Sequence, residues 1–332
     1  MPPAVSATVA EIQSQPGCWR RAAELAPSLG GVLPRPGERT AVVGCGTSWF
    51  VAQSYAALRE AAGQGETDAF AASEFPAHRR YDRVLAITRS GTTSEVLRLL
   101  AALGTTPTSA ITADPASPVV RAAGEAAVLD WADERSVVQT RFATSALALL
   151  RAQLGEDLAA AAADAERALA APLPEGLAAA GQVTFLGTGW TVGLAHEAAL
   201  KLREAAGAWT EAYPAMEYRH GPVSVTGPGR AVWVFGRLPE GLAADVAATG
   251  GTLVAGSGEA TESGSAPESG SAPRSGSGDA PDAGEGPRSG PGPVYDPLAD
   301  LVRAQRLAVA LAEARGADPD RPRNLTRSVV LD

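Results

Sequence analysis

The chain has 332 residues, of which 45% are hydrophobic, and a formal net charge of -9. That length allows two domains of ordinary size, each with its own core. The negative charge argues against non-specific nucleic-acid binding, which depends on clustered Lys and Arg. No apolar run is long enough to cross a membrane, and the first residues lack the features of a secretory signal. We therefore expect a cytoplasmic protein with neither a nucleic-acid nor a membrane partner.

The chain contains only two cysteines, Cys18 and Cys45. This number argues against a disulfide framework and against a multi-cysteine metal site. We expect both cysteines to be free thiols, and we predict no metal or organic cofactor.

The first half of the chain alternates apolar runs with helical patterns. Residues 1–37 are expected to form an N-terminal helical segment, and residues 38–155 a first domain. Short apolar runs predict strands at 41–44, 84–88, 109–112 and 126–130, and helices are expected at 49–62 and 95–103. Because helices separate the strands, right-handed crossovers and a parallel sheet follow.

The second half repeats this pattern after an alanine-rich stretch. Residues 156–174 are predicted to be a linker helix, and residues 175–332 a second domain. This domain opens on a strand at 183–187 and a helix at 192–206, continues with strands at 231–236 and 252–255, and ends with a helix at 298–315. The segment 256–293 is rich in Gly, Ser and Pro and poor in apolar residues, so we predict a disordered insertion there.

The fold class predicted from these patterns is α/β. One strand-loop-helix unit occurs twice, which indicates a duplicated architecture with two parallel sheets flanked by helices. In doubly wound, flavodoxin-like sheets of this kind, ligands bind at the carboxyl ends of the strands. Candidate site residues are therefore sought in the turns that follow predicted strands.

Two such turns are rich in small and hydroxyl residues. Gly44–Ser48 reads Gly-Cys-Gly-Thr-Ser, and Thr88–Glu95 reads Thr-Arg-Ser-Gly-Thr-Thr-Ser-Glu. Backbone N–H groups and hydroxyls at the start of a helix can cradle an anion, and helix capping accounts for only one or two of the five hydroxyls in the second turn. The second turn is the stronger physical indication of a phosphate site, to which Arg89 would add positive charge.

A third candidate lies on the helix predicted at 192–206. Glu197, Lys201 and Glu204 are spaced by four and three residues, which places them on one helical face. Taken alone, this spacing favours a solvated salt-bridge stripe over a catalytic cluster. His220 follows a carboxylate-rich segment and precedes Gly-Pro, whereas the other two histidines, His78 and His196, have no such neighbours.

Together these segments resemble the isomerase domain of glutamine:fructose-6-phosphate amidotransferase and the related SIS (sugar isomerase) deaminases. The resemblance covers nearly the whole chain apart from 256–293. Five segments carry it, in matching order and spacing: Cys45-Gly-Thr-Ser48, Arg89-Ser-Gly-Thr-Thr93, Glu197-Ala-Ala-Leu-Lys-Leu-Arg-Glu204, Glu217-Tyr-Arg-His-Gly-Pro222 and Pro322-Arg-Asn-Leu-Thr-Arg-Ser-Val329. The implied fold is two tandem SIS domains.

The resemblance also implies roles for individual residues. Glu204 matches the carboxylate that shuttles a proton between C1 and C2 of the open-chain sugar, while Glu197 and Lys201 match charged residues around the same site. His220 matches a ring-opening histidine that reaches the site from the neighbouring subunit, which implies a homodimer. The residues implied to bind the sugar phosphate are Cys45, Gly46, Thr47, Ser48, Thr88, Arg89, Ser90, Gly91, Thr93, Val137, Gln139 and Arg327.

Several positions depart from the family pattern. Arg327 stands where the family has a lysine placed for a Schiff base, and a guanidinium cannot act as that amine. Gln139-Thr-Arg141 replaces the family's Ser-Thr-Lys, and the glutamine-hydrolysing half is not expected because residue 2 is Pro rather than a nucleophilic cysteine.

The sequence therefore predicts a phosphosugar isomerase or amino-sugar-phosphate deaminase without glutaminase activity. Isomerisation, ammonia-dependent amination and deamination all remain open, as does a simple aldose-ketose isomerase. A non-catalytic phosphosugar sensor is the alternative from a different class, and it is motivated by Arg327.

Overall fold

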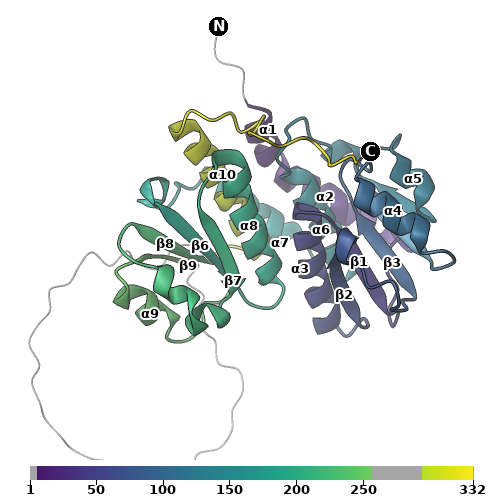
Figure 1. Cartoon of the computed structure of the whole chain (residues 1–332), viewed down its shortest axis with the longest axis horizontal. Coiled ribbons are helices and arrows are strands. Elements are labelled where there is room, and N and C mark those ends of the chain that lie inside the picture. Colours follow the sequence, from purple (N-terminus) through teal and green to yellow (C-terminus); the bar gives the residue numbers. More distant parts are fainter. Residues whose placement is uncertain (1–5, 256–293, 332) are drawn as a thin grey trace, which may run out of the picture.

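The computed structural model describes residues 6–255 and 294–331, and the predicted insertion at 256–293 lies outside them. The chain begins with α1 (Ala7–Gln13) and α2 (Gln15–Leu25), followed by a short 3-10 turn. Two parallel sheets then follow one another along the chain, as Figure 1 shows. Among residues 6–255 and 294–331, no helix has the length and apolarity needed to span a membrane.

The first sheet has five parallel strands in the order β2-β1-β3-β4-β5. Its strands are β1 (Thr40–Gly44), β2 (Thr67–Ala71), β3 (Arg83–Ile87), β4 (Thr108–Thr112) and β5 (Glu125–Val128). The helices associated with it are α3 (Thr47–Ala61), α4 (Ser94–Ala102), α5 (Pro118–Ala122) and α6 (Arg141–Gln153). Strands β1 and β3 are fully buried, as expected for central strands covered on both faces.

The second sheet has four parallel strands in the order β7-β6-β8-β9. Its strands are β6 (Gln182–Gly187), β7 (Thr210–Pro214), β8 (Arg230–Val234) and β9 (Thr252–Ala255). The helices associated with it are α7 (Ala159–Ala170), α8 (Thr191–Ala206), α9 (Leu242–Ala248) and α10 (Pro297–Ala314). Both sheets place the first strand between the second and third, so the predicted α/β class with two flavodoxin-like parallel sheets is confirmed.

The sequence analysis overlooked β2 and β7, the strand that follows the first helix in each half. Most of their residues are only partly buried, so their sequences lack the continuous apolar run that marks a central strand. The strand predicted at 126–130 is also displaced, because β5 ends at Val128 and Asp130 begins a 3-10 turn.

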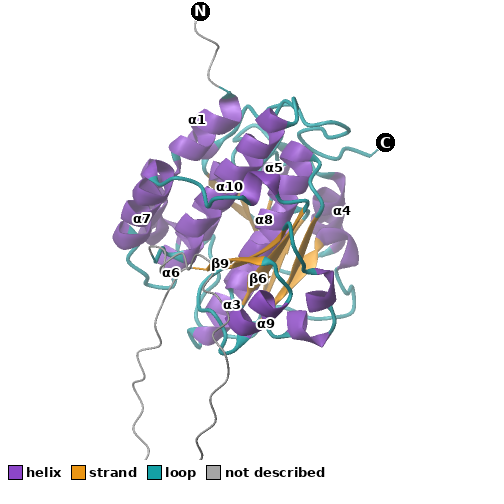
Figure 2. Ribbon diagram, turned by 90° about the vertical axis from the view of Figure 1, so that its left-hand side faces the viewer, coloured by secondary structure: helices purple, strands orange, loops and turns teal. Residues whose placement is uncertain are grey.

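The two sheets are joined through helices that share one apolar core. Trp19, Tyr55, Phe185 and Trp233 all belong to this core, although they come from opposite halves of the chain. Within this core, helix α8 packs against both α3 and α10. Seen from the side in Figure 2, the strands lie within a shell of helices.

The two halves of the chain approach each other closely at Gly193 in α8. A Cβ atom at this position would lie 2.3 Å from Ser54 Oγ and 2.4 Å from the carbonyl oxygen of Phe50, both in α3. Glycine therefore lets the two helices touch along their backbones. This contact fixes how far the polar face of α8 stands from the start of α3.

Replacing Gly193 with alanine should therefore force α8 away from α3. We expect a loss of about 1 to 3 kcal/mol in the free energy of unfolding, the usual cost of overpacking a tight site. The matched control is Gly17→Ala in α2, where nothing lies within 4 Å of the added Cβ and alanine should stabilise the helix by about 0.5 to 1 kcal/mol. Urea unfolding of both variants checks this, and a neutral Gly193→Ala would contradict the tight packing.

Candidate active site

Helix α8 presents three charged residues to the junction between the two halves. Lys201 Nζ donates a hydrogen bond to Glu204 Oε2 and lies 3.4 Å from Glu197 Oε1. The side chains of Glu197 and Lys201 are each only 2% exposed, whereas that of Glu204 is 21% exposed. The three residues predicted to share one helical face thus form a mostly buried cluster rather than a solvated stripe. Glu204 is the most exposed of the three.

The same ammonium group reaches across to the other half of the chain. Lys201 Nζ lies 3.0 Å from Thr47 Oγ1, the first residue of α3. One side chain therefore contacts both the predicted general base and the first predicted phosphate turn.

Burial and charge act in opposite directions within this cluster. Burial raises the pKa of Glu197 to about 7, because the attraction of Lys201 offsets the loss of solvation only in part. Burial also opposes the charged form of Lys201, but Glu197 and Glu204 outweigh it and raise the pKa of this ammonium. Lys201 is therefore a cation at neutral pH, while Glu197 can gain or lose a proton there.

The β1–α3 turn is built so that the chain can enter the helix abruptly. Gly44 allows this because a Cβ there would lie 2.6 Å from the backbone of Ser48, and Gly46 adopts a φ of 54°. Gly46 supplies no side-chain cap to α3, and the hydroxyl residues Thr47 and Ser48 are buried directly behind it. Cys45 is half-buried beside them, and burial raises the pKa of its thiol.

The β3–α4 turn carries the second set of hydroxyls. Gly91 has a φ of 63° and packs against Ser117, so the turn is held tightly against the next connection of the sheet. Thr88 and Ser90 are buried, and Ser90 Oγ accepts from the main-chain N–H and the hydroxyl of Thr92. Thr93 precedes α4 without capping it by a side-chain hydrogen bond.

The C-terminal tail lies against this second turn, where Figure 1 shows it in yellow. Ser94 N donates to the carbonyl of Val329, and Leu331 N donates to Ser94 Oγ at 2.8 Å. The hydroxyls of Thr92 and Ser328 are 2.9 Å apart. The predicted phosphate turn and the tail segment of the family resemblance are therefore direct neighbours.

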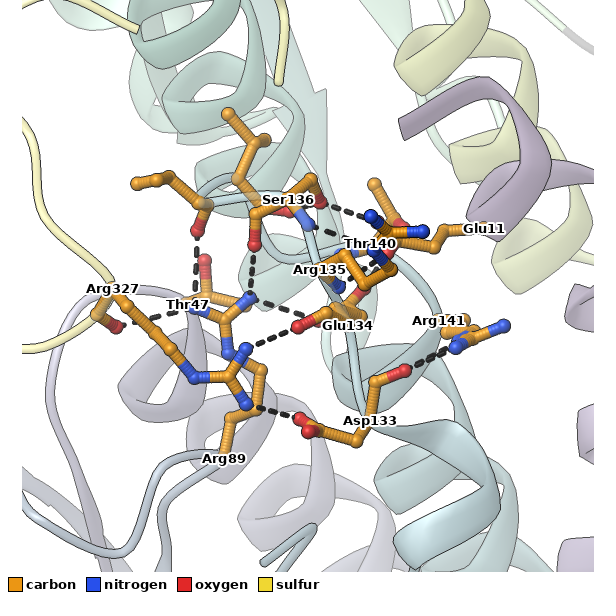
Figure 3. Close-up of polar contacts among 12 residues, drawn as sticks. Glu11, Thr47, Arg89, Asp133, Glu134, Arg135, Ser136, Thr140, Arg141 and Arg327 are labelled. Atoms are coloured by element: carbon orange, nitrogen blue, oxygen red, sulfur yellow. Dashed lines mark hydrogen bonds and ion pairs between the residues drawn. The ribbon is translucent and has the colours of Figure 1, made fainter. Parts of the chain in front are cut away.

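Arg89 connects three segments at the centre of Figure 3. Its buried guanidinium pairs with Glu134 Oε2 at 3.2 Å and donates to the main-chain carbonyls of Ser136, Val137 and Arg327, each at 3.1 Å. It is directed at these groups rather than at the hydroxyls of its own turn. Direct contact of Arg89 with a phosphate therefore stays a prediction, and it would require the guanidinium to leave these partners.

The loop at 133–140 is held from two sides. Glu134 accepts from the N–H and hydroxyl of Thr140 at the start of α6, and Glu11 of α1 accepts from the main-chain N–H groups of residues 135 and 136. This loop carries Val137, whose carbonyl binds Arg89, and Gln139, whose buried Oε1 has no hydrogen-bond partner. Within residues 6–255 and 294–331, Gln139 Oε1 is therefore a buried acceptor that no donor satisfies.

Arg327 binds the loop at 133–140, and no contact joins its side chain to the α8 cluster among the described residues. Its guanidinium forms an ion pair with Asp133 and donates to the main-chain carbonyl of Glu134, as Figure 3 shows. The side chain is 39% exposed. In this position it fastens the tail to the loop at 133–140.

His220 is not brought to the α8 cluster within one chain. It lies on the exposed 3-10 turn Glu217–His220 after β7, whereas Glu204 is in the last turn of α8, before β7 begins. The length of β7 separates the two, roughly 16 Å for five residues. The turn is held on the far side by the contact of Arg219 with Asp245 of α9 at 2.6 Å.

Sequence reasoning missed the two carboxylates that shape the loop, Glu11 and Glu134. Neither stands in a recognisable motif, and the partners of Glu11 are more than 120 residues away. One signal was available and not used: Lys201 is the single lysine in the chain. Among the described residues, no group of three or more His, Cys, Asp or Glu side chains is arranged to hold a metal ion.

The raised pKa of Glu197 makes a prediction about stability. The pKa of Glu197 is about 7 in the folded chain, against an ordinary 4.5. The folded state therefore keeps the proton to a higher pH than the unfolded state does, and the free energy of unfolding should fall as the pH rises between these values. Glu197→Gln should match the wild type near pH 5 and exceed it at pH 8 by about 1 to 3 kcal/mol, because one pKa unit corresponds to about 1.4 kcal/mol.

Thermal and urea unfolding at both pH values provide the measurement. Lys201 and Glu204 on α8, with Thr47 on α3, face the group, and all three are unchanged in the variant. An equal loss of stability at pH 5 and pH 8 would show that Glu197 is needed as a carboxylate.

No family model matches the chain, but individual proteins do. It is 33% identical over 162 residues to the glutamine–fructose-6-phosphate aminotransferase of Aeropyrum pernix, a match covering 47% of this chain and 24% of that protein. It is 29% identical over 344 residues to the corresponding enzyme of Pectobacterium atrosepticum, covering 93% of this chain and 54% of that protein. The chain thus spans between about a quarter and about half the length of these relatives.

Solved structures match over nearly the whole chain. Glucosamine-6-phosphate deaminase from Thermotoga maritima has a TM-score of 0.76 and 23% identity, covering 98% of this chain and all of the other. The C-terminal domain of the aminotransferase from Francisella tularensis has a TM-score of 0.70 and 19% identity, covering 96% and 99%. The chain is an SIS-domain protein, related in sequence to the glutamine–fructose-6-phosphate aminotransferases and sharing the fold of solved phosphosugar isomerases and deaminases.

Proposed function

We propose that this chain is a cytoplasmic amino-sugar-phosphate deaminase/isomerase that acts on a hexose 6-phosphate derivative. The observation that carries the proposal is the contact of one buried ammonium, Lys201, with both Glu204 and Thr47. A carboxylate suited to proton transfer is thereby held at a fixed distance from a hydroxyl turn suited to a phosphate. An open-chain sugar phosphate has a group for each of them: a terminal phosphate for the hydroxyl turn and an acidic C–H bond for the carboxylate.

The proposed reaction begins with proton transfer at carbon. With a 2-amino aldose phosphate, Glu204 takes the proton from C2, the C–H electron pair forms a C1=C2 double bond, and the carbonyl oxygen at C1 gains a proton. Return of the proton from Glu204 to C1 leaves an imine at C2. Water then adds to C2 and ammonia leaves, which yields the 2-keto sugar phosphate.

The two hydroxyl turns have the proposed role of fixing the phosphate. Thr47 and Ser48 are in the first turn and Thr88, Ser90 and Thr93 in the second, and both turns lie at the carboxyl end of the first sheet. Because α3 and α4 begin there without side-chain caps, their N-termini favour an anion. Gln139, with its unpartnered carbonyl, is the proposed contact for a sugar hydroxyl.

We further propose that the working form is a homodimer in which His220 of a second copy opens the sugar ring. His220 is exposed and is separated from Glu204 by the length of β7, so one chain alone does not supply both groups to one site. Exposed Met216 directly precedes the turn that carries His220, and an apolar side chain of this kind suits a subunit contact.

Similarity to known proteins supports the same reaction class. The Thermotoga maritima structure is that of a glucosamine-6-phosphate deaminase, and a tagatose-6-phosphate ketose/aldose isomerase from Escherichia coli also matches, with a TM-score of 0.68. The second match makes a simple aldose-ketose isomerase the second candidate. Both activities would use Glu204 in the same way and differ in whether nitrogen is released.

The first test is ammonia release from glucosamine, galactosamine and fructosamine phosphates. We expect turnover with at least one of them and a loss of about 100- to 10,000-fold in Glu204→Gln, the range typical of general acid/base groups. Glu175→Gln, which alters an exposed carboxylate outside the candidate site, should leave activity unchanged. Ketose formation without ammonia would indicate the simple isomerase, and phosphosugar binding without turnover would indicate a sensor.

The second test is complementation between two inactive variants. Glu204→Gln and His220→Ala should each lose activity alone, and unfolding and refolding them together should restore about a quarter of the wild-type activity. This value follows because half of the randomly formed dimers are mixed and each mixed dimer has one intact site out of two. No recovery from a verified mixture of dimers would contradict a shared site.

A further inference from the structure

Lys201 has no counterpart anywhere else in the chain. It is the single lysine among 28 lysine and arginine residues. The other 27 of these residues are arginines, including Arg327 at the position where the resemblance would place a reactive amine. The question is therefore what Lys201 supplies that arginine does not, and whether its amine is available for covalent chemistry.

The contacts of Lys201 use the ammonium form. Its Nζ donates to Glu204 Oε2 and to Thr47 Oγ1 at 3.0 Å, and it faces Glu197 Oε1 at 3.4 Å. An ammonium has three N–H donors and no acceptor, so Lys201 can make both hydrogen bonds and still face the Glu197 carboxylate as an ion-pair partner. A compact, fully buried cation also fits this space between α8 and α3, whereas the larger planar guanidinium of arginine would not meet all three partners in the same way.

This arrangement also orients the Thr47 hydroxyl. Because Lys201 can only donate, Thr47 Oγ1 must be the acceptor in their hydrogen bond. The proton of the hydroxyl is then left to be donated elsewhere. The nearby Glu197 carboxylate or an oxygen of a bound phosphate can receive it.

Formation of an imine would require Lys201 to give up these contacts. Water would leave with the sugar carbonyl oxygen and two hydrogens of Nζ, and before the new bond to the carbonyl carbon could form the ammonium would have to release a third proton and become a neutral amine. That would remove the cation that the Glu204 carboxylate and the buried Glu197 side chain both contact, which is unfavourable for the cluster. Arg327 offers no substitute, because its guanidinium is bound to Asp133 and to the Glu134 carbonyl.

We propose that Lys201 is a positioning residue that acts as a permanent cation, holding the base Glu204 and the phosphate donor Thr47 in register, and that no lysine of this chain forms an imine with the sugar. The proposal rests on the proposed function for its substrate class. Carbon-bound protons are then moved through an enediol or enolamine of the sugar itself.

The first part of the experiment uses the wild-type protein. Fructose 6-phosphate and glucosamine 6-phosphate are each added with sodium borohydride, and the protein is examined by intact-mass and peptide mass spectrometry. We expect no reduced sugar adduct on the peptide that contains Lys201. We also expect Lys201 to resist acetylation by acetic anhydride in the folded protein and to react after unfolding in urea. A sugar adduct on Lys201, or rapid acetylation in the folded state, would overturn the proposal.

The second part separates positioning from a purely structural role. Binding of inorganic phosphate is measured by calorimetry for the wild type, Lys201→Met and Lys201→Arg, after circular dichroism has shown which variants are folded. We expect phosphate affinity to fall about tenfold in Lys201→Met, because a charge-assisted hydrogen bond no longer orients Thr47, and to recover in part in Lys201→Arg. Wild-type phosphate affinity in a folded Lys201→Met would overturn the proposal.

The experiment distinguishes failure of the positioning role of Lys201 from failure of the proposed deaminase function. If the wild type turned over none of the amino-sugar phosphates, the deaminase proposal would fail, yet acetylation and phosphate binding would still report on Lys201. Conversely, a wild type that releases ammonia and also carries a borohydride-trapped adduct on Lys201 would keep the function and overturn the positioning role.

Discussion

The structure depends on one buried cation placed between two helices from opposite halves of the chain. Lys201 is almost fully buried, and an unpaired charge in such a position would destabilise the fold by several kcal/mol. It is tolerated because Glu204, Glu197 and Thr47 surround it. Since Thr47 belongs to α3 and the carboxylates to α8, the same contact that solvates the ammonium also fixes one half of the chain against the other.

Close packing of α8 against α3 makes the contact between Lys201 and Thr47 possible. Gly193 allows α8 to touch α3 along the backbone, two turns before Lys201. A larger residue there would increase the distance between Nζ and Thr47. Stability and the geometry of the site are therefore coupled at one helix crossing, and the proposed base and phosphate turn cannot move independently of each other.

A second buried ion pair organises the opposite side of the site. Arg89 and Glu134 are both inaccessible to solvent, and together they bind the loop at 133–140, the turn after β3 and the C-terminal tail. A buried pair of this kind contributes little net stability compared with apolar packing, but its directional bonds fix the register of the segments that it joins. We infer that Arg89 acts on the site by placing Gln139 and the tail.

Much of the fold could be predicted because central parallel strands appear in the sequence as continuous apolar runs. The apolar runs at β1, β3, β6 and β8 located both sheets, whereas the partly exposed β2 and β7 did not stand out. The spacing of Glu197, Lys201 and Glu204 predicted a shared face but could not distinguish a buried cluster from a solvated one. That distinction depends on α3, which covers the face and is far away in the sequence.

Long-range polar contacts could not be predicted from the sequence for the same reason. Nothing near Arg89 in the sequence indicates that its partner is Glu134, and nothing near Glu11 indicates that it binds the main chain at residues 135 and 136. The position of Arg327 was noticed, but its ion pair with Asp133 required the tail to be seen lying beside the loop. Side-chain identity predicted chemistry, and only the folded chain revealed which groups were already occupied.

The central claim is that Glu204 moves a carbon-bound proton of a sugar phosphate held by the two hydroxyl turns. Its most direct test is solvent deuterium incorporation at C1 and C2 of hexose 6-phosphates and their 2-amino derivatives, followed by proton NMR in D2O. The structure predicts exchange at one of these carbons in the wild type and none in Glu204→Gln. Saturable binding of these sugars with no exchange at either carbon would contradict the claim and favour a phosphosugar sensor.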